Sequence, residues 1–132
     1  GTSGVSKTFP FGLTGYSEMH HSLATANLID SSTFDDGFSI INRGSYSSGA
    51  GHTGTENVFW NTSGSGLLRS QQFGWGYVIG TSLQLEVELE SGLFSGSSGP
   101  PTDFMEGYEE GAELTPSSLY EDQLERRLSL TP

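Results

Sequence analysis

Short apolar runs separated by glycine, serine and asparagine constrain the fold of this chain more than any other feature. Between residues 20 and 90 these runs are ANLID, GFSII, ENVFW, GLLRS, GYVIG and the alternating SLQLEVELE. Each run is too short for a typical helix, and β-branched and aromatic residues between turn formers favour strands. The 19 glycines and the hydrophobic content of 33% also argue against a helical bundle. The core of this 132-residue chain is therefore expected to consist of many short strands in one domain.

A weak internal repeat indicates how these strands are arranged. The segment His21–Asp30 aligns with His52–Asn61 after one gap, and DGFSIIN at 36–42 and WGYVIGT at 75–81 follow at comparable places. The first alignment matches three identical pairs, His21/His52, Thr25/Thr55 and Asn27/Asn57. Repeats of this kind are typical of a winding chain. We predict an all-β fold, a short solenoid of parallel strands with about three or four coils, in which asparagines stack between coils.

The composition divides the chain into four parts. Residues 1–19 are expected to be irregular or edge structure, 20–90 the β-helix coils, 91–114 an acidic Gly/Ser/Pro-rich linker, and 115–130 a C-terminal capping helix. For this helix, Thr115 is the expected cap and Pro116 the first helical residue. An apolar stripe at helical spacing predicts that the helix packs on the body, and a partner-binding amphipathic helix is the alternative; the stripe consists of Leu119, Leu124 and Leu128, with Tyr120.

The charge of the chain excludes several classes of partner. The formal net charge is −11, with 16 acidic against 5 basic residues, which disfavours nucleic acids and anionic membranes. No apolar run approaches the ~20 residues needed to span a bilayer, so no membrane insertion is expected. The absence of cysteine excludes disulfides and thiolate metal sites. We expect an extracellular or cell-surface protein, and we interpret the sequence, which starts at Gly1, as a processed chain or a piece of a longer one.

Four segments in order resemble the C-terminal part of secreted bacterial right-handed parallel β-helix proteins of the pectate-lyase-like superfamily. They are DDGFSIINRG, GAGHTGTENVFWN, FGWGYVIGT and LTPSSLYEDQLERRL. The resemblance covers about residues 16–128, apart from an acidic insertion at 86–113. It implies a β-helix fold and an extracellular polysaccharide as ligand or substrate, while the superfamily includes lyases, hydrolases, adhesins and structural fibres.

A stack of so few coils leaves open sheet edges at its ends, and open edges pair with other strands. The C-terminal helix is expected to cover one end. The other end would be covered by residues 1–19, by missing N-terminal coils, or by another copy of the chain stacked end to end, as in a filament or adhesin subunit.

Three residues are the candidates for catalysis, namely Asp36, His52 and Glu56. A histidine can act as a general base near neutral pH, and paired carboxylates suit glycoside hydrolysis. Against this, the glycines around His52 favour an imidazole that hydrogen-bonds the backbone at a bend, and Asp35–Asp36–Gly37 is typical of a turn. Lyase chemistry would also require a basic residue, for which Arg43 and Arg69 are available in the coil region.

Other residues suggest ligands. Asp35, Asp36 and Glu56 could hold calcium, although no cofactor is required and no metal site is assigned. A transition-metal site from Glu18, His20, His21 and His52 is disfavoured, because adjacent strand residues point to opposite faces. Trp60, Trp75 and Tyr77 could stack against sugar rings, or else pack in the core. Asn61–Thr62–Ser63 matches a glycosylation sequon.

The sequence therefore predicts an extracellular β-solenoid module that is structural or carbohydrate-associated and non-catalytic as an isolated chain. The C-terminal part of a polysaccharide lyase or glycoside hydrolase, and a self-assembling filament or adhesin subunit, are the two alternatives.

Overall fold

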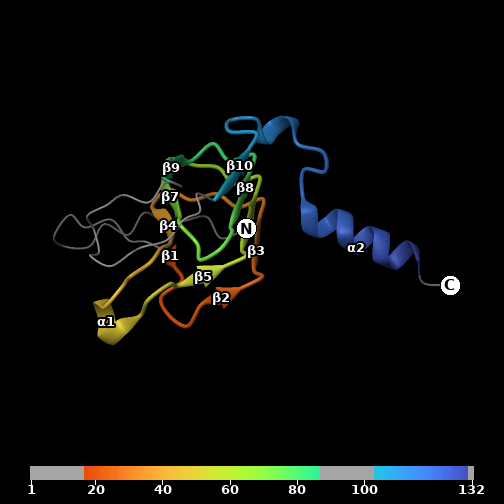
Figure 1. Cartoon of the computed structure of the whole chain (residues 1–132). Coiled ribbons are helices and arrows are strands. Elements are labelled where there is room, and N and C mark those ends of the chain that lie inside the picture. Colours follow the sequence, from red (N-terminus) through yellow and green to blue (C-terminus); the bar gives the residue numbers. More distant parts are fainter. Residues whose placement is uncertain (1–16, 87–102, 131–132) are drawn as a thin grey trace.

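A computed structural model of the chain describes residues 17–86 and 103–130 (Figure 1). The described strands are β1 (Ser17–Glu18), β2 (Ala24–Thr25), β3 (Leu28–Asp30), β4 (Gly37–Ile40), β5 (Gly54–Thr55), β6 (Val58–Trp60), β7 (Leu67–Ser70), β8 (Tyr77–Ile79), β9 (Gln84–Glu86) and β10 (Phe104–Glu106). The helices are α1 (Tyr46–Gly49), a 3-10 turn η1 (Gly111–Glu113) and α2 (Leu119–Ser129). The architecture is thus mostly strands, with one longer helix at the C-terminal end.

The strands form three sheets, and the chain returns to each of them repeatedly. Sheet A has the order β1-β4-β7-β9, sheet B pairs β2 with β5, and sheet C has the order β3-β6-β8-β10. Every pair of strands among the described residues is parallel. Because parallel strands cannot be joined by tight hairpins, each strand must be followed by a crossover before the chain meets the same sheet again.

The register confirms part of the internal repeat. Thr25 pairs with Thr55 on sheet B, and Leu28 pairs with Val58 on sheet C, both at a spacing of 30 residues. The predicted correspondence between residues 36–42 and 75–81 is wrong. Residues 37–40 of β4 pair with residues 67–70 of β7, whereas residues 77–79 of β8 pair with β6. GYVIG resembles GFSII in composition, although the two runs belong to different sheets.

The core lies between the sheets and is built from columns of side chains. Ile40, Phe59, Leu68, Val78 and Leu83 are fully buried. Phe59 and Val78 occupy the same register position on neighbouring strands of sheet C, while the residues beside them in each strand are more exposed. This alternation with period two is what a sheet with one face in the core requires.

Next to this core runs a ladder of polar side chains. The backbone N–H and the Nδ2 of Asn27 both donate to Oδ1 of Asn57, at 3.0 and 2.8 Å. Asn57 repeats the arrangement, since its backbone N–H and its Nδ2 both donate to Oε1 of Gln72, at 2.8 Å each. The backbone N–H of Gln72 then donates to the carboxylate of Asp103. The predicted stacking of Asn27 on Asn57 is confirmed, and the ladder extends two members beyond it.

A glycine makes room for the third member of the ladder. A Cβ added at Gly76 would lie 2.1 Å from Nε2 of Gln72, so only glycine leaves space for that side chain. The last member, Asp103, is 3% exposed. Burial raises the pKa of its carboxyl to about 6, although hydrogen bonds from Ser70, Gln72 and Gly76 favour the ionised form.

The expectation of a linker across residues 91–114 is wrong for its described part, 103–114. Strand β10 pairs with β8 as the outer strand of sheet C, and η1 follows it. The side chain of Leu114 lies where a Cβ at Gly80 would be, and Gly80 has a φ of +65°. Residues 103–114 are therefore packed against the sheets rather than joining two separate units.

The C-terminal helix also differs from the prediction. It starts at Leu119 and its cap is Ser118, whose hydroxyl accepts from the N–H of Glu121; Thr115 is not the cap and Pro116 is not helical. None of its residues is buried, and it extends away from the body (Figure 1). It is not a capping helix, because only its first residues contact the sheets. No described helix has the length and apolarity needed to cross a bilayer.

Its attachment point is Asp30, at the end of β3. The Asp30 carboxylate accepts hydrogen bonds from the Ser118 hydroxyl at 2.5 Å and from the N–H groups of Leu119 and Tyr120 at 3.2 and 3.0 Å. A carboxylate at this position satisfies unpaired N–H groups and complements the helix dipole. Helix α2 is thus held near the outer edge of sheet C that begins with β3. Of the N-terminal segment predicted across residues 1–19, Ser17–Glu18 forms an edge strand of sheet A, and residues 1–16 lie outside the described part.

Candidate functional site

His52, the first catalytic candidate, lies between α1 and β5 and forms an isolated antiparallel bridge with Asn42. Its Nε2 is 3.2 Å from Nδ2 of Asn42, and its ring lies 4.9 Å from that of Phe73. Its Nδ1 is buried and has no hydrogen-bond partner among the described residues. Burial lowers its pKa, so the imidazole is neutral near pH 7. The predicted hydrogen bond to the backbone is replaced by one to a side-chain amide.

The two carboxylate candidates lie elsewhere on the chain path. Asp36 lies between β3 and β4, where its carbonyl accepts from Leu67 at 3.1 Å, and Glu56 lies exposed between β5 and β6. Asp36 thus lies in a connection from sheet C to sheet A, and Glu56 in one from sheet B to sheet C. His52 lies in a connection from sheet A to sheet B. The three candidates therefore occupy three different connections between sheets. In the described residues no hydrogen bond, ion pair or ring contact joins any two of them.

Two of the residues considered for a transition-metal site, Glu18 and His20, have other partners. The carboxylate of Glu18 is 2.6 Å from Nδ1 of His20 and 3.1 Å from Nη1 of Arg43, which also contacts His20. Within residues 17–86 and 103–130, no three or more histidine, aspartate or glutamate side chains are grouped as ion ligands. Arg69, the other basic candidate, forms a 2.6 Å ion pair with Glu86 on the neighbouring strand.

The three aromatic candidates have different environments. Trp60 is half-buried and its Nε1 donates to the carbonyl of Pro116 at 3.0 Å, so it anchors the C-terminal segment. Trp75 and Tyr77 are 54% and 40% exposed. Tyr77 points away from the core because Val78, the next residue of β8, is buried. Two of the three predicted residues therefore remain available for a ligand.

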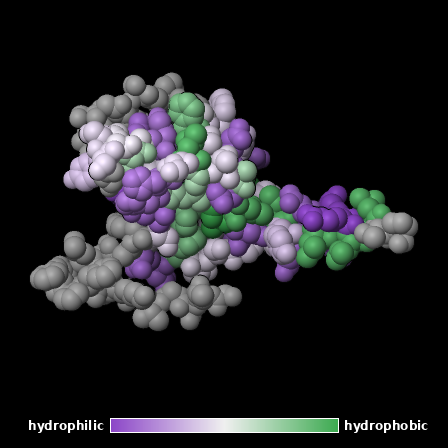
Figure 2. Space-filling model, turned by 90° about the horizontal axis from the view of Figure 1, so that it is seen from below, coloured by the Kyte–Doolittle hydropathy of each residue, from purple (hydrophilic) through white to green (hydrophobic). Residues whose placement is uncertain are grey.

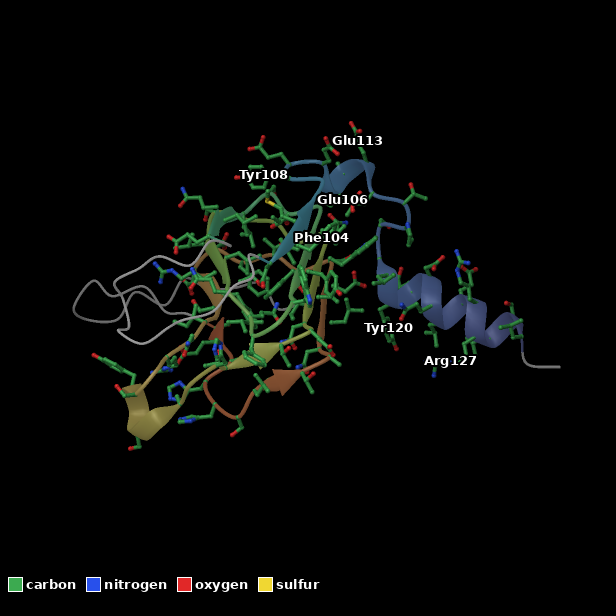
Figure 3. All side chains as sticks on the ribbon, viewed as in Figure 1. Phe104, Glu106, Tyr108, Glu113, Tyr120 and Arg127 are labelled. Atoms are coloured by element: carbon green, nitrogen blue, oxygen red, sulfur yellow. The ribbon has the colours of Figure 1, made fainter. Side chains whose placement is uncertain are left out.

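The sequence did not reveal the aromatic neighbour of Tyr77. Phe104 pairs with Tyr77 in the register of β10 and β8, their ring centroids are 6.3 Å apart, and Phe104 is 48% exposed. Figure 3 shows Phe104 on β10, with Glu106 further along the same strand. We name Trp75, Tyr77 and Phe104 the aromatic strip. A signal for Phe104 was present, because DFME at 103–106 repeats the polar, apolar, apolar, acidic order of NLID at 27–30.

Two acidic residues, Glu56 and Glu106, lie near the aromatic strip. The N–H of Glu56 donates to the carbonyl of Trp75 at 2.7 Å, and Glu106 lies two residues after Phe104. An aromatic surface bordered by carboxylates can hold the C–H face of a polar, uncharged ligand and accept hydrogen bonds from its hydroxyl groups. It is poorly suited to a polyanion.

No protein family, no curated protein and no solved structure matches the chain.

Proposed function

We propose that this chain is a short right-handed parallel β-helix that serves as a non-catalytic, carbohydrate-associated module of an extracellular protein. The β-helix interpretation is supported by three sheets that the chain visits in turn and by pairs spaced 30 residues apart. Sheets A and C have four strands each, which agrees with a stack of about three or four coils. The resemblance to the pectate-lyase-like superfamily is part of this proposal.

The observation that carries the proposed function is the aromatic strip. Exposed aromatic side chains gathered on one surface mark a candidate binding site, because exposed apolar groups gain free energy when they leave water. A hydrogen-bonded sheet fixes Tyr77 and Phe104 before the ligand arrives, which lowers the entropic cost of binding. We expect the ligand to be an uncharged polysaccharide, because the chain carries a net charge of −11 and repels polyuronates.

The placement of the catalytic candidates supports a binding module rather than an enzyme. Glycoside hydrolysis requires two carboxyl groups about 5–10 Å apart on either side of one bond. Asp36 and Glu56 lie in different connections between sheets, and His52 contacts Asn42 and Phe73 rather than a carboxylate.

Binding can be tested by affinity electrophoresis of the chain through gels that contain xylan, glucan or polygalacturonate. We expect retardation by a neutral polysaccharide and none by polygalacturonate. The double variant Tyr77→Ala/Phe104→Ala should migrate freely, while Tyr46→Ala, which removes an aromatic ring that is 62% exposed on α1, should be retarded like the wild type. Equal retardation of wild type and double variant would contradict the proposal. Release of reducing or unsaturated sugar ends, lost in Asp36→Ala, His52→Ala and Glu56→Ala, would show an enzyme instead.

A further inference from the structure

Strand β3 is an edge strand of sheet C among the described residues. The carbonyl of Asn27 accepts from Val58, and the N–H of Ser31 donates to Trp60, both at 2.9 Å. Because alternate residues of a parallel strand bond to opposite sides, Leu28 and Asp30 direct their backbone groups away from β6. The Asp30 carbonyl accepts from the Ser32 hydroxyl. Among the described residues, no strand pairs with this outer edge of β3.

Beside this edge lies an apolar hollow. Its volume is about 520 Å3, and it is lined by Leu28, Ile29, Asp30, Ser32, Phe34, Phe38 and Tyr120. Figure 2, seen from below, shows hydrophobic residues gathered between the body and α2 and continuing along the helix. Ile29, Phe34 and Phe38 also pack against the buried core, so the hollow lies at the end of the core beside β3.

The polar ladder ends at this edge with an unused acceptor. Each asparagine of the ladder donates its N–H and Nδ2 to the side-chain oxygen of the next member, so Asn57 Oδ1 receives two hydrogen bonds from Asn27. The Oδ1 of Asn27 itself has no donor among the described residues, and Asn27 is exposed. An added strand with an asparagine or glutamine at this position would continue the ladder with the same geometry.

Electrostatics argue against a second copy of the chain as the added strand. In sheet C the register aligns Asp30, Trp60, Ile79 and Glu106, and in sheet A it aligns Glu18, Ser39, Arg69 and Glu86. Head-to-tail stacking in this register would place Glu106 of one copy beside Asp30 of the next, and Glu86 beside Glu18, about 4.8 Å apart. Asp103, an acceptor when ionised, would face the Oδ1 of Asn27. A strand with a basic residue over Asp30 would instead be attracted.

We propose that the outer edge of β3 binds an extended segment of a different polypeptide, which adds as a further parallel strand. This segment carries an asparagine or glutamine over Asn27, an apolar residue two positions later over Ile29 and the hollow, and a lysine or arginine next, over Asp30. Main-chain hydrogen bonds supply affinity and the alternating side chains supply specificity. This site is separate from the aromatic strip and does not depend on carbohydrate binding.

The chain itself provides the template for a probe. Residues 55–62, TENVFWNT, contain β6 (Val58–Trp60), the strand next to β3 in sheet C. The probe is the fluorescent peptide TENVFKNT, with lysine in place of the tryptophan, and its binding to the full chain is measured by fluorescence anisotropy at low salt. We expect saturable binding. Replacing the first asparagine of the peptide by aspartate, or its lysine by glutamate, should each weaken binding about tenfold.

Two controls make the result decisive. A scrambled peptide of the same composition should not bind. In the protein, Leu28→Pro removes an N–H that points to the free edge and not to β6, so binding should be lost while the thermal unfolding transition is retained. Equal binding of the scrambled or aspartate peptide, no binding at millimolar concentration, or competition between the peptide and self-association of the chain would each overturn the proposal. The peptide comparisons remain decisive even if Leu28→Pro fails to fold.

Discussion

Asn57→Asp is the sharpest test of the polar ladder, because it exchanges one amide for a carboxylate of the same shape. Asn57 is fully buried and uses both kinds of atom in its side chain. Its Oδ1 accepts from Asn27, while its Nδ2 donates to the carbonyl of Ala24 at 2.9 Å and to Oε1 of Gln72 at 2.8 Å. The substitution therefore keeps the accepting atom and places a second oxygen against two oxygens.

The expected loss of stability follows from these contacts. The carbonyl of Ala24 and Oε1 of Gln72 each lose one hydrogen bond, which costs about 1 kcal/mol each, although Oε1 of Gln72 keeps the backbone N–H of residue 57; an ionised carboxylate in the core costs several kcal/mol more. We expect the free energy of unfolding to fall by about 5 kcal/mol at pH 7, a large part of the 5–15 kcal/mol typical of a domain. Burial raises the pKa of the new carboxyl, so the loss should shrink to about 2–3 kcal/mol at pH 4, where the protonated acid donates one bond.

Urea unfolding followed by tryptophan fluorescence at pH 7 and pH 4 measures this difference. The matched control is Asn61→Asp, which removes one hydrogen bond to the carbonyl of Ser117 at a more exposed position and should cost about 1 kcal/mol at either pH. If the free energy of unfolding of Asn57→Asp at pH 7 lies within about 0.5 kcal/mol of the wild-type value, the ladder does not stabilise the fold as argued. A difference of that size is roughly the error of such a measurement.

Three further predictions concern charged and titrating groups. Burial raises the pKa of Asp103 from 3.8 to about 6, so the folded chain binds a proton more tightly than the unfolded chain. This group should therefore add stability, at most about 3 kcal/mol, as the pH falls from 7 to 4. Asp103→Asn should remove that pH dependence in urea titrations. Burial lowers the pKa of His52, so its contribution has the opposite sign and is lost as the pH falls below about 6.5; His52→Gln should unfold with a smaller loss on acidification than the wild type. Asp30→Ala leaves the first N–H groups of α2 without their acceptor, and hydrogen exchange should then show fraying of the helix while the sheets stay protected.

Sequence alone could predict the stacked asparagines because identical residues recur at the spacing of one repeat. Asn27 and Asn57 are 30 residues apart, and their neighbours match as well. Gln72 could not be placed in the same way, since it reaches the ladder from outside the strand that carries the position, through the space left by Gly76. Asp103 follows a Gly/Ser/Pro-rich stretch, residues 91–102, whose composition resembles a linker. A repeat is visible in sequence only where the strand itself supplies the side chain.

The C-terminal helix shows a different kind of limit. Thr115 and Pro116 form one start signal, and Ser118 with Glu121 forms another, the capping box. The second is used, because the segment before it is held by the sheets: Trp60 and Asn61 donate to the carbonyls of Pro116 and Ser117, and Asp30 receives the first N–H groups of the helix. These contacts join residues 56 to 90 positions apart, so local propensity cannot choose between the two signals. The same contacts hold the start of α2 beside β3. Tyr120, which accompanies the leucine stripe that predicted a packed helix, thus lines the hollow where we place the added strand, while Leu128 of the stripe is 64% exposed.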